Sequence, residues 1–325
     1  MNQMTKANLR DQLLERRERL EYAISDLGDA TDLLRLLREV DSALHRVDSG
    51  NFGTCLVCHT KVGDDMLAEN PMAQYCLCDL TRDQQMALQH DLDLAAHVQL
   101  ALLPKQNMSY AGWEAHFRYI PAGPVSGDYC DLVPRDGDNL FFLVGDVSGK
   151  GVAASLFMAR LNAVFRSLLE TGSSVSAMMQ QANRLLCDST VPSHYATLVC
   201  GKAEESGRVE VCNAGHCGPF LLHNGDVTVL ESTGVPLGIF ENGPYQVQTA
   251  DLAPGDTLFL FTDGVSEARD GQDQEYGTER LAEFLARTAA LRPQDLASAC
   301  LQEVNTFAAG APQTDDVTIM VIRRT

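Results

Sequence analysis

The stretch VGDVSGKG, residues 144–151, follows an apolar run with an aspartate and then turns through glycines around a lysine. Three further stretches also set aspartates beside strand-like apolar sequence: SGDY at 126–129, FTDG at 261–264 and TDDVT at 314–318. If these places meet in the fold, the carboxylates repel one another unless a cation joins them. Oxygen ligands without a nearby histidine or thiolate suit Mg²⁺ or Mn²⁺ better than zinc. We therefore predict a two-metal hydrolase site that acts on a phosphoryl group.

Composition limits the classes of protein that fit. The chain has 325 residues, 45% of them hydrophobic, and a formal net charge of -19. Its length suggests two domains or one domain with an appendage. The acidic balance leaves no basic face for nucleic acid. The N-terminus lacks a secretory apolar run, and no later run approaches about 18 apolar residues, so we expect a cytoplasmic protein with no membrane span.

Residues 1–80 have the pattern of a separate module. Apolar residues recur at helical spacing from Leu9 to about Val47, on both sides of a break at 26–32. The break holds a glycine with flanking aspartates, which end one helix and cap the next. The pattern predicts a helical hairpin.

Two pairs of cysteines follow the hairpin. Cys55 and Cys58 form a Cys-x-x-Cys pair, and Cys76 and Cys78 follow at loop distance. In a reducing cytosol, this clustering indicates metal binding rather than disulfides. Four thiolates suffice for a closed tetrahedral zinc site. Asp79 is an alternative fourth ligand, and we prefer Cys78 because thiolate is the softer donor.

This part of the chain resembles the DksA/TraR family. The shared features are the hairpin, a glycine-aromatic-glycine turn at 50–53, the zinc-finger spacing and a proline-bearing stretch at 70–73. The family's last pair is Cys-x-x-Cys, whereas this chain has Cys-x-Cys. The family acts on RNA polymerase through an acidic hairpin tip, which segment 26–30 resembles. Ordinary helix caps explain the same residues, and a sensor or dimerisation role is the other interpretation of the module.

Residues 81–106 are predicted to form a connector helix. Apolar residues recur at helical spacing between Leu80 and Pro104, where the proline ends the pattern. An amphipathic helix of about six turns often pairs with a copy of itself. We therefore predict a homodimer formed through this helix.

The remaining residues, 107–325, alternate strands and helices. Apolar runs predict strands at 114–120, 139–144, 195–200, 208–213, 220–223, 227–230, 257–262 and 317–322, and helices at 152–170, 175–187, 279–291 and 293–307. Asn224-Gly225 is typical of a type I′ hairpin turn. Hairpins of this kind mean antiparallel sheet, so the predicted class is α+β, with helices outside a layered sandwich.

This C-terminal part resembles the PPM-type metal-dependent serine/threonine protein phosphatases, in their bacterial SpoIIE/RsbU-like branch. Five motifs match in order: SGDYCD at 126–131, GDVSGKGVAA at 145–154, NAGH at 213–216, FTDGVSE at 261–267 and TDDVT at 314–318. The resemblance covers about residues 110–325. It implies an αββα sandwich, in which two antiparallel sheets are flanked by helices.

The resemblance also implies the ligands of a pair of Mn²⁺ or Mg²⁺ ions. Asp128 would bind one ion, Asp146 would bridge both, and the backbone carbonyl of Val147 would add a ligand. Asp263 and Asp315 would complete the site on the other side.

Several nearby residues have more than one interpretation. Ser126 stands where the family normally has glycine, and the arginine with which larger relatives hold substrate phosphate has no counterpart. His216 could be a general acid or a structural residue that bonds its turn. Lys150 could offset Asp146 or face water. Asp131 and Asp316 stay outside the predicted ligand set.

Together these features predict a phosphatase that hydrolyses phosphoserine or phosphothreonine with a metal-activated water. For this branch, the implied substrate is a phosphorylated anti-sigma-factor antagonist in a partner-switching pathway, with the zinc module controlling activity through the connector helix. The alternative is a non-catalytic regulator whose zinc hairpin binds RNA polymerase or another large partner. The intact set of four aspartates favours the enzyme.

Overall fold

The computed structural model describes residues 10, 13–14, 16–20, 22, 31–48, 52–55, 61–62, 82–135, 137, 139–188 and 194–325. These residues form two compact units, Met1–Gln89 and His90–Thr325. Each unit has hydrophobic clusters of its own. The predicted connector helix is observed as α4 (Arg82–Leu102), and the boundary between the units falls within it.

The first unit contains α2 (Thr31–Asp48), which has one apolar face. This face joins a buried cluster made of Leu13, Val40, Ala43, Leu44, Phe52, Cys55 and Val62. Arg17 Nε donates to Asp41 Oδ1 at 2.7 Å, so helical residues before the predicted break lie against α2. The break itself falls largely outside the described residues. The hairpin tip and its polymerase contact therefore stay predictions.

The second unit is built on two antiparallel sheets. The six-stranded sheet has the order β1 (Asn107–Tyr110), β2 (Trp113–Ile120), β11 (Val317–Arg324), β10 (Thr257–Phe261), β7 (Phe220–His223) and β8 (Asp226–Val229). The five-stranded sheet has the order β3 (Tyr129–Arg135), β4 (Asn139–Val147), β5 (Ala196–Glu204), β6 (Arg208–Ala214) and β9 (Gln248–Asp251). Apolar side chains from both sheets form the core between them.

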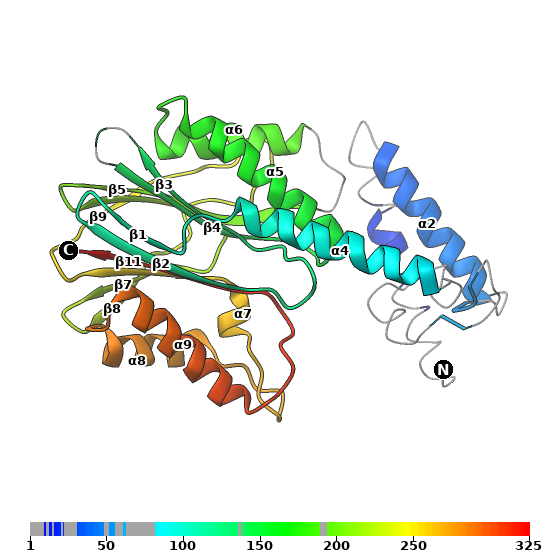
Figure 1. The fold of residues 1–325 in the computed structure, drawn as a ribbon. Coiled ribbons are helices and arrows are strands. Elements are labelled where there is room, and N and C mark those ends of the chain that lie inside the picture. Colours follow the sequence, from blue (N-terminus) through cyan, green and yellow to red (C-terminus); the bar gives the residue numbers. More distant parts are fainter. Residues whose placement is uncertain are drawn as a thin grey trace. The chain divides into compact units, whose positions relative to one another are not determined.

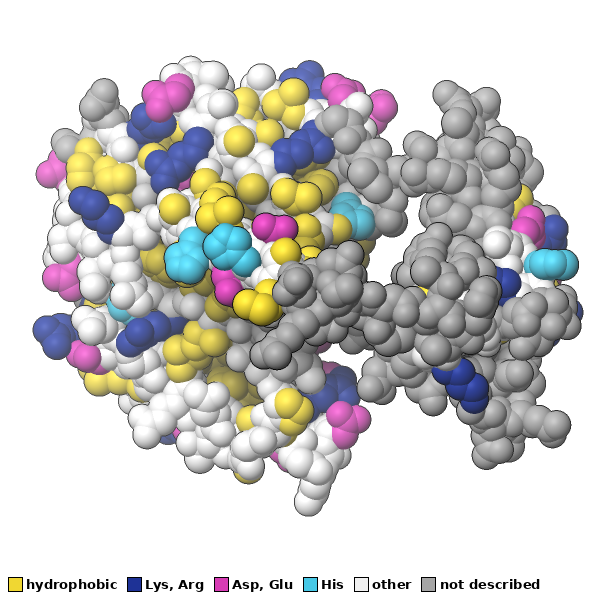
Figure 2. Space-filling model, turned by 45° about the vertical axis from the view of Figure 1, so that its right-hand side comes forward, with side chains coloured by type: hydrophobic (Ala, Val, Ile, Leu, Met, Phe, Trp, Pro, Cys, Tyr) yellow, Lys and Arg dark blue, Asp and Glu magenta, His cyan; other side chains and the backbone are white. Residues whose placement is uncertain are grey.

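Helices cover both outer faces of this sandwich (Figure 1). Helices α5 (Val152–Leu169) and α6 (Val175–Cys187) pack on the five-stranded sheet, and α8 (Thr278–Thr288) and α9 (Pro293–Ala308) pack on the six-stranded sheet. The predicted αββα architecture is thus confirmed. On the face drawn in Figure 2, basic side chains of the described residues are scattered among apolar and acidic ones.

Helix α5 is the single described helix that is long and apolar enough to span a membrane by length and composition. Its apolar face packs into the core, where Met158, Leu161 and Phe165 are fully buried. The apolar character of α5 therefore comes from its place between the sheet and α6.

Most predicted elements are confirmed, and the exceptions have physical reasons. Asn224 and Gly225 have φ of 50° and 90°, as the hairpin between β7 and β8 requires. The prediction missed β1, β3, β9 and the short helix α7 (Asp263–Ser266). The first five residues of β3 are all buried, so the strand shows no alternation. Pro134 is tolerated because β3 lies at a sheet edge.

Candidate active site

Three of the predicted ligands lie at strand ends that the topology brings together. Asp146 is the penultimate residue of β4, Asp263 directly follows the loop after β10, and Asp315 precedes β11. Strands β10 and β11 are antiparallel, with Phe261 opposite Ile319. Asp263 and Asp315 therefore lie at the same end of the six-stranded sheet.

Neighbouring carboxylates affect the pKa values of Asp146 and Asp263. Burial, then the charges of Asp263 and Asp315, raise the pKa of Asp146 to about 7. Burial and the charge of Asp315 raise the pKa of Asp263 to about 6. We call Asp146, Asp263 and Asp315 the acidic cluster.

Lys150 is the cation that reaches this cluster from the loop before α5. Its Nζ lies 3.2 Å from Asp315 Oδ2 and donates to the carbonyl of Thr314 at 2.6 Å. Its charge also lowers the pKa of Asp263, against the raising effect of burial. Lys150 therefore offsets a carboxylate, but its partner is Asp315 and not Asp146, the residue expected from the sequence.

The carbonyl of Val147 is close to the same place. A Cβ atom added to Gly127 would lie 3.0 Å from Val147 O and 3.4 Å from Asp146 Oδ1. These two oxygens therefore border the same small space beside the Gly127 backbone. Any larger side chain at Gly127 would press on both of them.

Asp128 is held differently from the acidic cluster. It is almost fully buried, and its Oδ2 accepts hydrogen bonds from Thr262 Oγ1 at 2.9 Å and Thr318 Oγ1 at 2.5 Å. Burial raises its pKa well above the usual range, with a further contribution from Asp146. Sequence reasoning did not foresee the two threonines, although each stands within three residues of an aspartate in its motif.

The two aspartates outside the predicted ligand set are structural. Asp316 accepts from the backbone N–H of Ala122 at 2.7 Å and of Gly127 at 2.9 Å, which fixes the segment leading to Asp128. Asp131 is buried and accepts two hydrogen bonds from the guanidinium of Arg166, each 2.7 Å long. Neither is simply a solvated residue.

His216 is also structural in this arrangement. Its backbone N–H donates to Asn213 Oδ1 at 2.8 Å, and its carbonyl accepts from Asn213 Nδ2 at 3.0 Å. Its Nδ1 lies 2.8 Å from Thr197 Oγ1. Burial lowers the pKa of His216 to about 4, so the ring is neutral near pH 7. These contacts support the interpretation that His216 bonds its turn.

The donors at the acidic cluster fit a hard, partly hydrated cation. Among the described residues, no three His, Cys, Asp or Glu side chains are close enough together to chelate one ion as placed. The donors present are carboxylate and carbonyl oxygens, and Mg²⁺ usually keeps several waters while binding one or two carboxylates. The Lys150 ammonium beside Asp315 already shows that a cation is accommodated there.

Of the four cysteines predicted to bind zinc, only Cys55 is a described residue. It is buried in the hydrophobic cluster of the first unit. Cys58, Cys76 and Cys78 lie outside the described residues, as does Asp79. The zinc site therefore stays a prediction.

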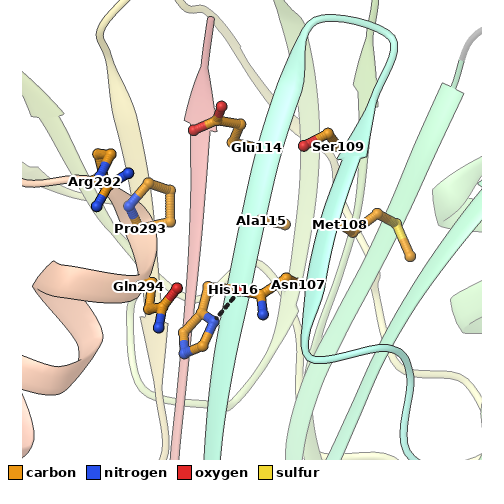
Figure 3. A pocket seen from close by; sticks show the side chains of 9 residues that line it. All are labelled: Asn107, Met108, Ser109, Glu114, Ala115, His116, Arg292, Pro293 and Gln294. Carbon is orange, nitrogen blue, oxygen red and sulfur yellow. Dashed lines mark hydrogen bonds between the residues drawn. The ribbon is translucent and has the colours of Figure 1, made fainter.

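Two cavities differ in their relation to the acidic cluster. One, of about 70 Å³, is lined by Asp315 and by apolar residues of α9 and the segment before β11. The other, of about 180 Å³, lies between β1, β2 and the start of α9 (Figure 3). In it, His116 Nδ1 lies 2.7 Å from Asn107 Oδ1. His116 lies opposite Val321 in β11, whereas Asp315 precedes the first residue of that strand, Val317. The second cavity therefore lies away from the acidic cluster.

The two packed antiparallel sheets flanked by helices have the PP2C-type phosphatase fold, and solved structures support this fold assignment. The SiaA-PP2C domain of Pseudomonas aeruginosa matches with a TM-score of 0.66 at 21% identity, covering 74% of this chain and 98% of that one. The RsbU and RsbW domains of a Mycobacterium tuberculosis protein match with a TM-score of 0.59 at 30% identity, covering 68% of this chain and 61% of that one.

The chain belongs to the family described as Stage II sporulation protein E (SpoIIE), whose model matches residues 136–325. It is similar to phosphoserine phosphatase RsbU of Bacillus subtilis, with 30% identity over 191 residues, 58% of this chain and 57% of that protein. It is also similar to protein IcfG of Synechocystis, with 28% identity over 267 residues, 72% of this chain and 41% of that protein. The chain thus spans about half the length of these relatives.

Proposed function

We propose that this chain is a metal-dependent protein serine/threonine phosphatase. The observation that carries the proposal is the convergence of Asp146, Asp263 and Asp315 in a partly buried site, where burial and neighbouring carboxylates raise the pKa values of Asp146 and Asp263. Divalent cations bound there would supply Lewis-acid activation of water and would offset the charge of a phosphoryl group. Membership of the SpoIIE family and the similarity to a phosphoserine phosphatase support the same activity.

In this proposal, each group has a defined task. The acidic cluster and the carbonyl of Val147 would hold two Mn²⁺ or Mg²⁺ ions. Because the two hydroxyl partners of Asp128 both donate to Oδ2, a direct ligand role of Asp128 would fall on Oδ1. Lys150 offsets the charge of Asp315 from the exposed side of the site.

The proposed substrate is a phosphorylated protein, and the similarity to RsbU favours phosphoserine. By the family resemblance, we infer an anti-sigma-factor antagonist in a bacterial partner-switching pathway. The apolar cavity beside Asp315 offers room for a side chain of such a protein next to its phosphorylated residue. We further propose that the zinc module of the first unit controls the site through α4, in a homodimer.

The activity is tested by Mn²⁺-dependent release of phosphate from a phosphoserine peptide. We expect Asp146→Asn to lower the rate at least about a hundredfold, because it removes the carboxylate proposed to bridge both ions. Asp226→Asn, which changes an exposed aspartate in β8, is the matched control. If the native chain and Asp146→Asn release phosphate at the same rate, or neither releases any, the phosphatase proposal is wrong and a scaffold role gains support.

The zinc proposal has a separate test. Purified protein should contain about one zinc per chain by mass spectrometry of the metal content, and Cys55→Ser should lose it. Zinc retained in full by this variant would contradict the proposed ligand set.

A further inference from the structure

The cavity of about 70 Å³ beside Asp315 has mainly apolar walls. Leu301, Val304 and Ala308 line it from α9, and Pro312 lines it from the turn that follows this helix. Because one water needs about 10–15 Å³ of such space, the cavity has room for about five non-hydrogen atoms. It is therefore the right size for a single aliphatic side chain such as that of leucine, which has four carbon atoms.

This cavity shares a wall with the acidic cluster. Asp315 belongs to both, and Gly264, which directly follows Asp263, also lines the cavity. The side chain of Asp315 is 35% exposed, so the boundary between the two is open to solvent. A substrate whose phosphoryl group lies at the cluster therefore has its neighbouring residues beside the cavity. Since an extended chain advances about 3.3 Å per residue, the residues within about three positions of the phosphorylated one are within reach.

Hydrogen bonds and close packing hold the walls in place. Gln313 Nε2 donates to the carbonyl of Ile120 at 2.9 Å and to that of Asp315 at 2.8 Å, which ties the segment before β11 to the end of β2. A Cβ atom added to Gly264 would collide with the carbonyl of Asp316, so α7 packs tightly against the same segment. An occupant therefore finds the cavity already formed, and its binding requires little ordering of the walls.

The walls favour an uncharged occupant. Arg269, the basic residue in the lining, already pairs with Asp273 at 2.8 Å and with Glu275 at 2.6 Å. A carboxylate in the cavity would lie against side chains such as Leu301 and would lose its hydration without gaining a free cation. An aliphatic side chain has no such cost and removes apolar surface from water.

We propose that this cavity is a specificity pocket, which takes a leucine-sized aliphatic side chain from a residue within about three positions of the phosphorylated serine. The inference rests on the proposed function and deepens it, because it defines a sequence feature of the protein substrate. The specificity pocket binds the flanking residue and takes no part in the chemistry. Its effect is therefore confined to substrates that have such a residue.

The test measures kcat/KM of the full-length protein with Mn²⁺ on short phosphoserine peptides. Each peptide has a single leucine in an alanine and glycine background, at one of the three positions before or after the phosphoserine. At one position, leucine should raise kcat/KM about thirtyfold over alanine, and aspartate there should be no better than alanine. Hydrolysis of p-nitrophenyl phosphate, which has no flanking residue, is the reference for the chemistry.

Variants of the wall show whether the specificity pocket causes the preference. Ala308→Leu fills the pocket, so the preference for leucine should fall to about threefold or less, while p-nitrophenyl phosphate hydrolysis stays within about twofold. Ala286→Leu, the same change at an exposed position of α8, should keep the full preference. Leu301→Ala enlarges the pocket and should move the preference from leucine to phenylalanine, which gives a second readout if Ala308→Leu fails to fold.

Each possible failure has a distinct meaning. Equal kcat/KM for leucine and alanine at all six positions, in a chain that hydrolyses p-nitrophenyl phosphate, would overturn the inference and leave the proposed function standing. A leucine preference that is unchanged in Ala308→Leu and in Leu301→Ala would also overturn it, because the selectivity would then arise elsewhere. If the native chain hydrolyses neither kind of substrate, the proposed function fails and the specificity pocket fails with it.

Discussion

The acidic cluster should make the metal-free protein less stable as the pH rises, and Asp146 allows this effect to be calculated. Its pKa is about 7 in the folded chain, raised first by burial and then by neighbouring carboxylates, against about 3.9 in an unfolded chain. Between these values the folded state binds more protons, so the free energy of unfolding falls with increasing pH. The proton's stabilising effect is fully lost above the folded pKa.

The magnitude follows from the two pH units between pH 5 and the folded pKa. At about 1.4 kcal/mol per unit, the loss between pH 5 and pH 8 is at most about 3 kcal/mol. For a domain of this size, that corresponds to a fall in Tm of roughly 6–12 °C. His216 acts in the opposite direction at lower pH, because burial lowers its pKa to about 4 and only the unfolded chain is protonated near pH 5.

The contribution of Asp146 is therefore measured as a difference. Calorimetric Tm values of the native chain and of Asp146→Asn are compared at pH 5, 6, 7 and 8, in one series with a chelator and in a second series with Mn²⁺ in its place. The native chain should lose stability relative to the variant across this range, and Mn²⁺ should restore more stability at pH 8 than at pH 5, because at pH 5 it must displace a proton. A Tm difference that is independent of pH would refute the reasoning.

Three further substitutions test the surroundings of the cluster. Arg166→Met should lower the free energy of unfolding, measured in urea, by about 3–5 kcal/mol, because it leaves Asp131 buried without its cation. The double variant with Asp131→Asn should recover part of this loss. An equal loss in the single and the double variant would contradict the prediction. Gly127→Ala should weaken Mn²⁺ binding measured by calorimetry, since the new Cβ would stand 3.0 Å from Val147 O; unchanged affinity would show that the segment adapts freely. Lys150→Gln should tighten Mn²⁺ binding about fivefold, the equivalent of about 1 kcal/mol for losing a competing cation at a partly exposed site; weaker binding would mean that Lys150 supports the ions.

The sequence alone predicted the sandwich well because its strongest signals are local. Alternating apolar runs, the Asn224-Gly225 turn and the long helices all follow from short-range patterns, and all are observed. Strand β3 was missed because five consecutive residues of it are buried, which removes the period-two signal. The contact between Gln99 and Ser126 was also beyond prediction, because it joins residues 27 positions apart through a backbone that belongs to no regular element.

The same limit applies to the individual aspartates of the motifs. Asp315 and Asp316 are chemically identical neighbours, yet the first faces Lys150 and the cluster while the second accepts two backbone N–H groups from another segment. The path of the chain just before β11 decides that Asp315 points toward Lys150 and Asp316 toward the backbone of Ala122 and Gly127. Sequence reasoning could identify the motif, but the assignment of Asp128 to a pair of threonine hydroxyls required the packed structure.

The contrast between the hydrogen-bonded aspartates and those of the acidic cluster supports the proposal that the cluster binds divalent cations. Three buried aspartates, Asp128, Asp131 and Asp316, each have at least two hydrogen-bond donors from elsewhere in the fold. In the acidic cluster, burial and like charges instead raise the pKa values of Asp146 and Asp263, and the opposing contributions come from adjacent backbone N–H groups and, for Asp263, from Lys150. The fold is therefore able to place hydrogen-bond donors beside buried carboxylates. The scarcity of hydrogen-bond donors at the acidic cluster is what a site completed by divalent cations requires.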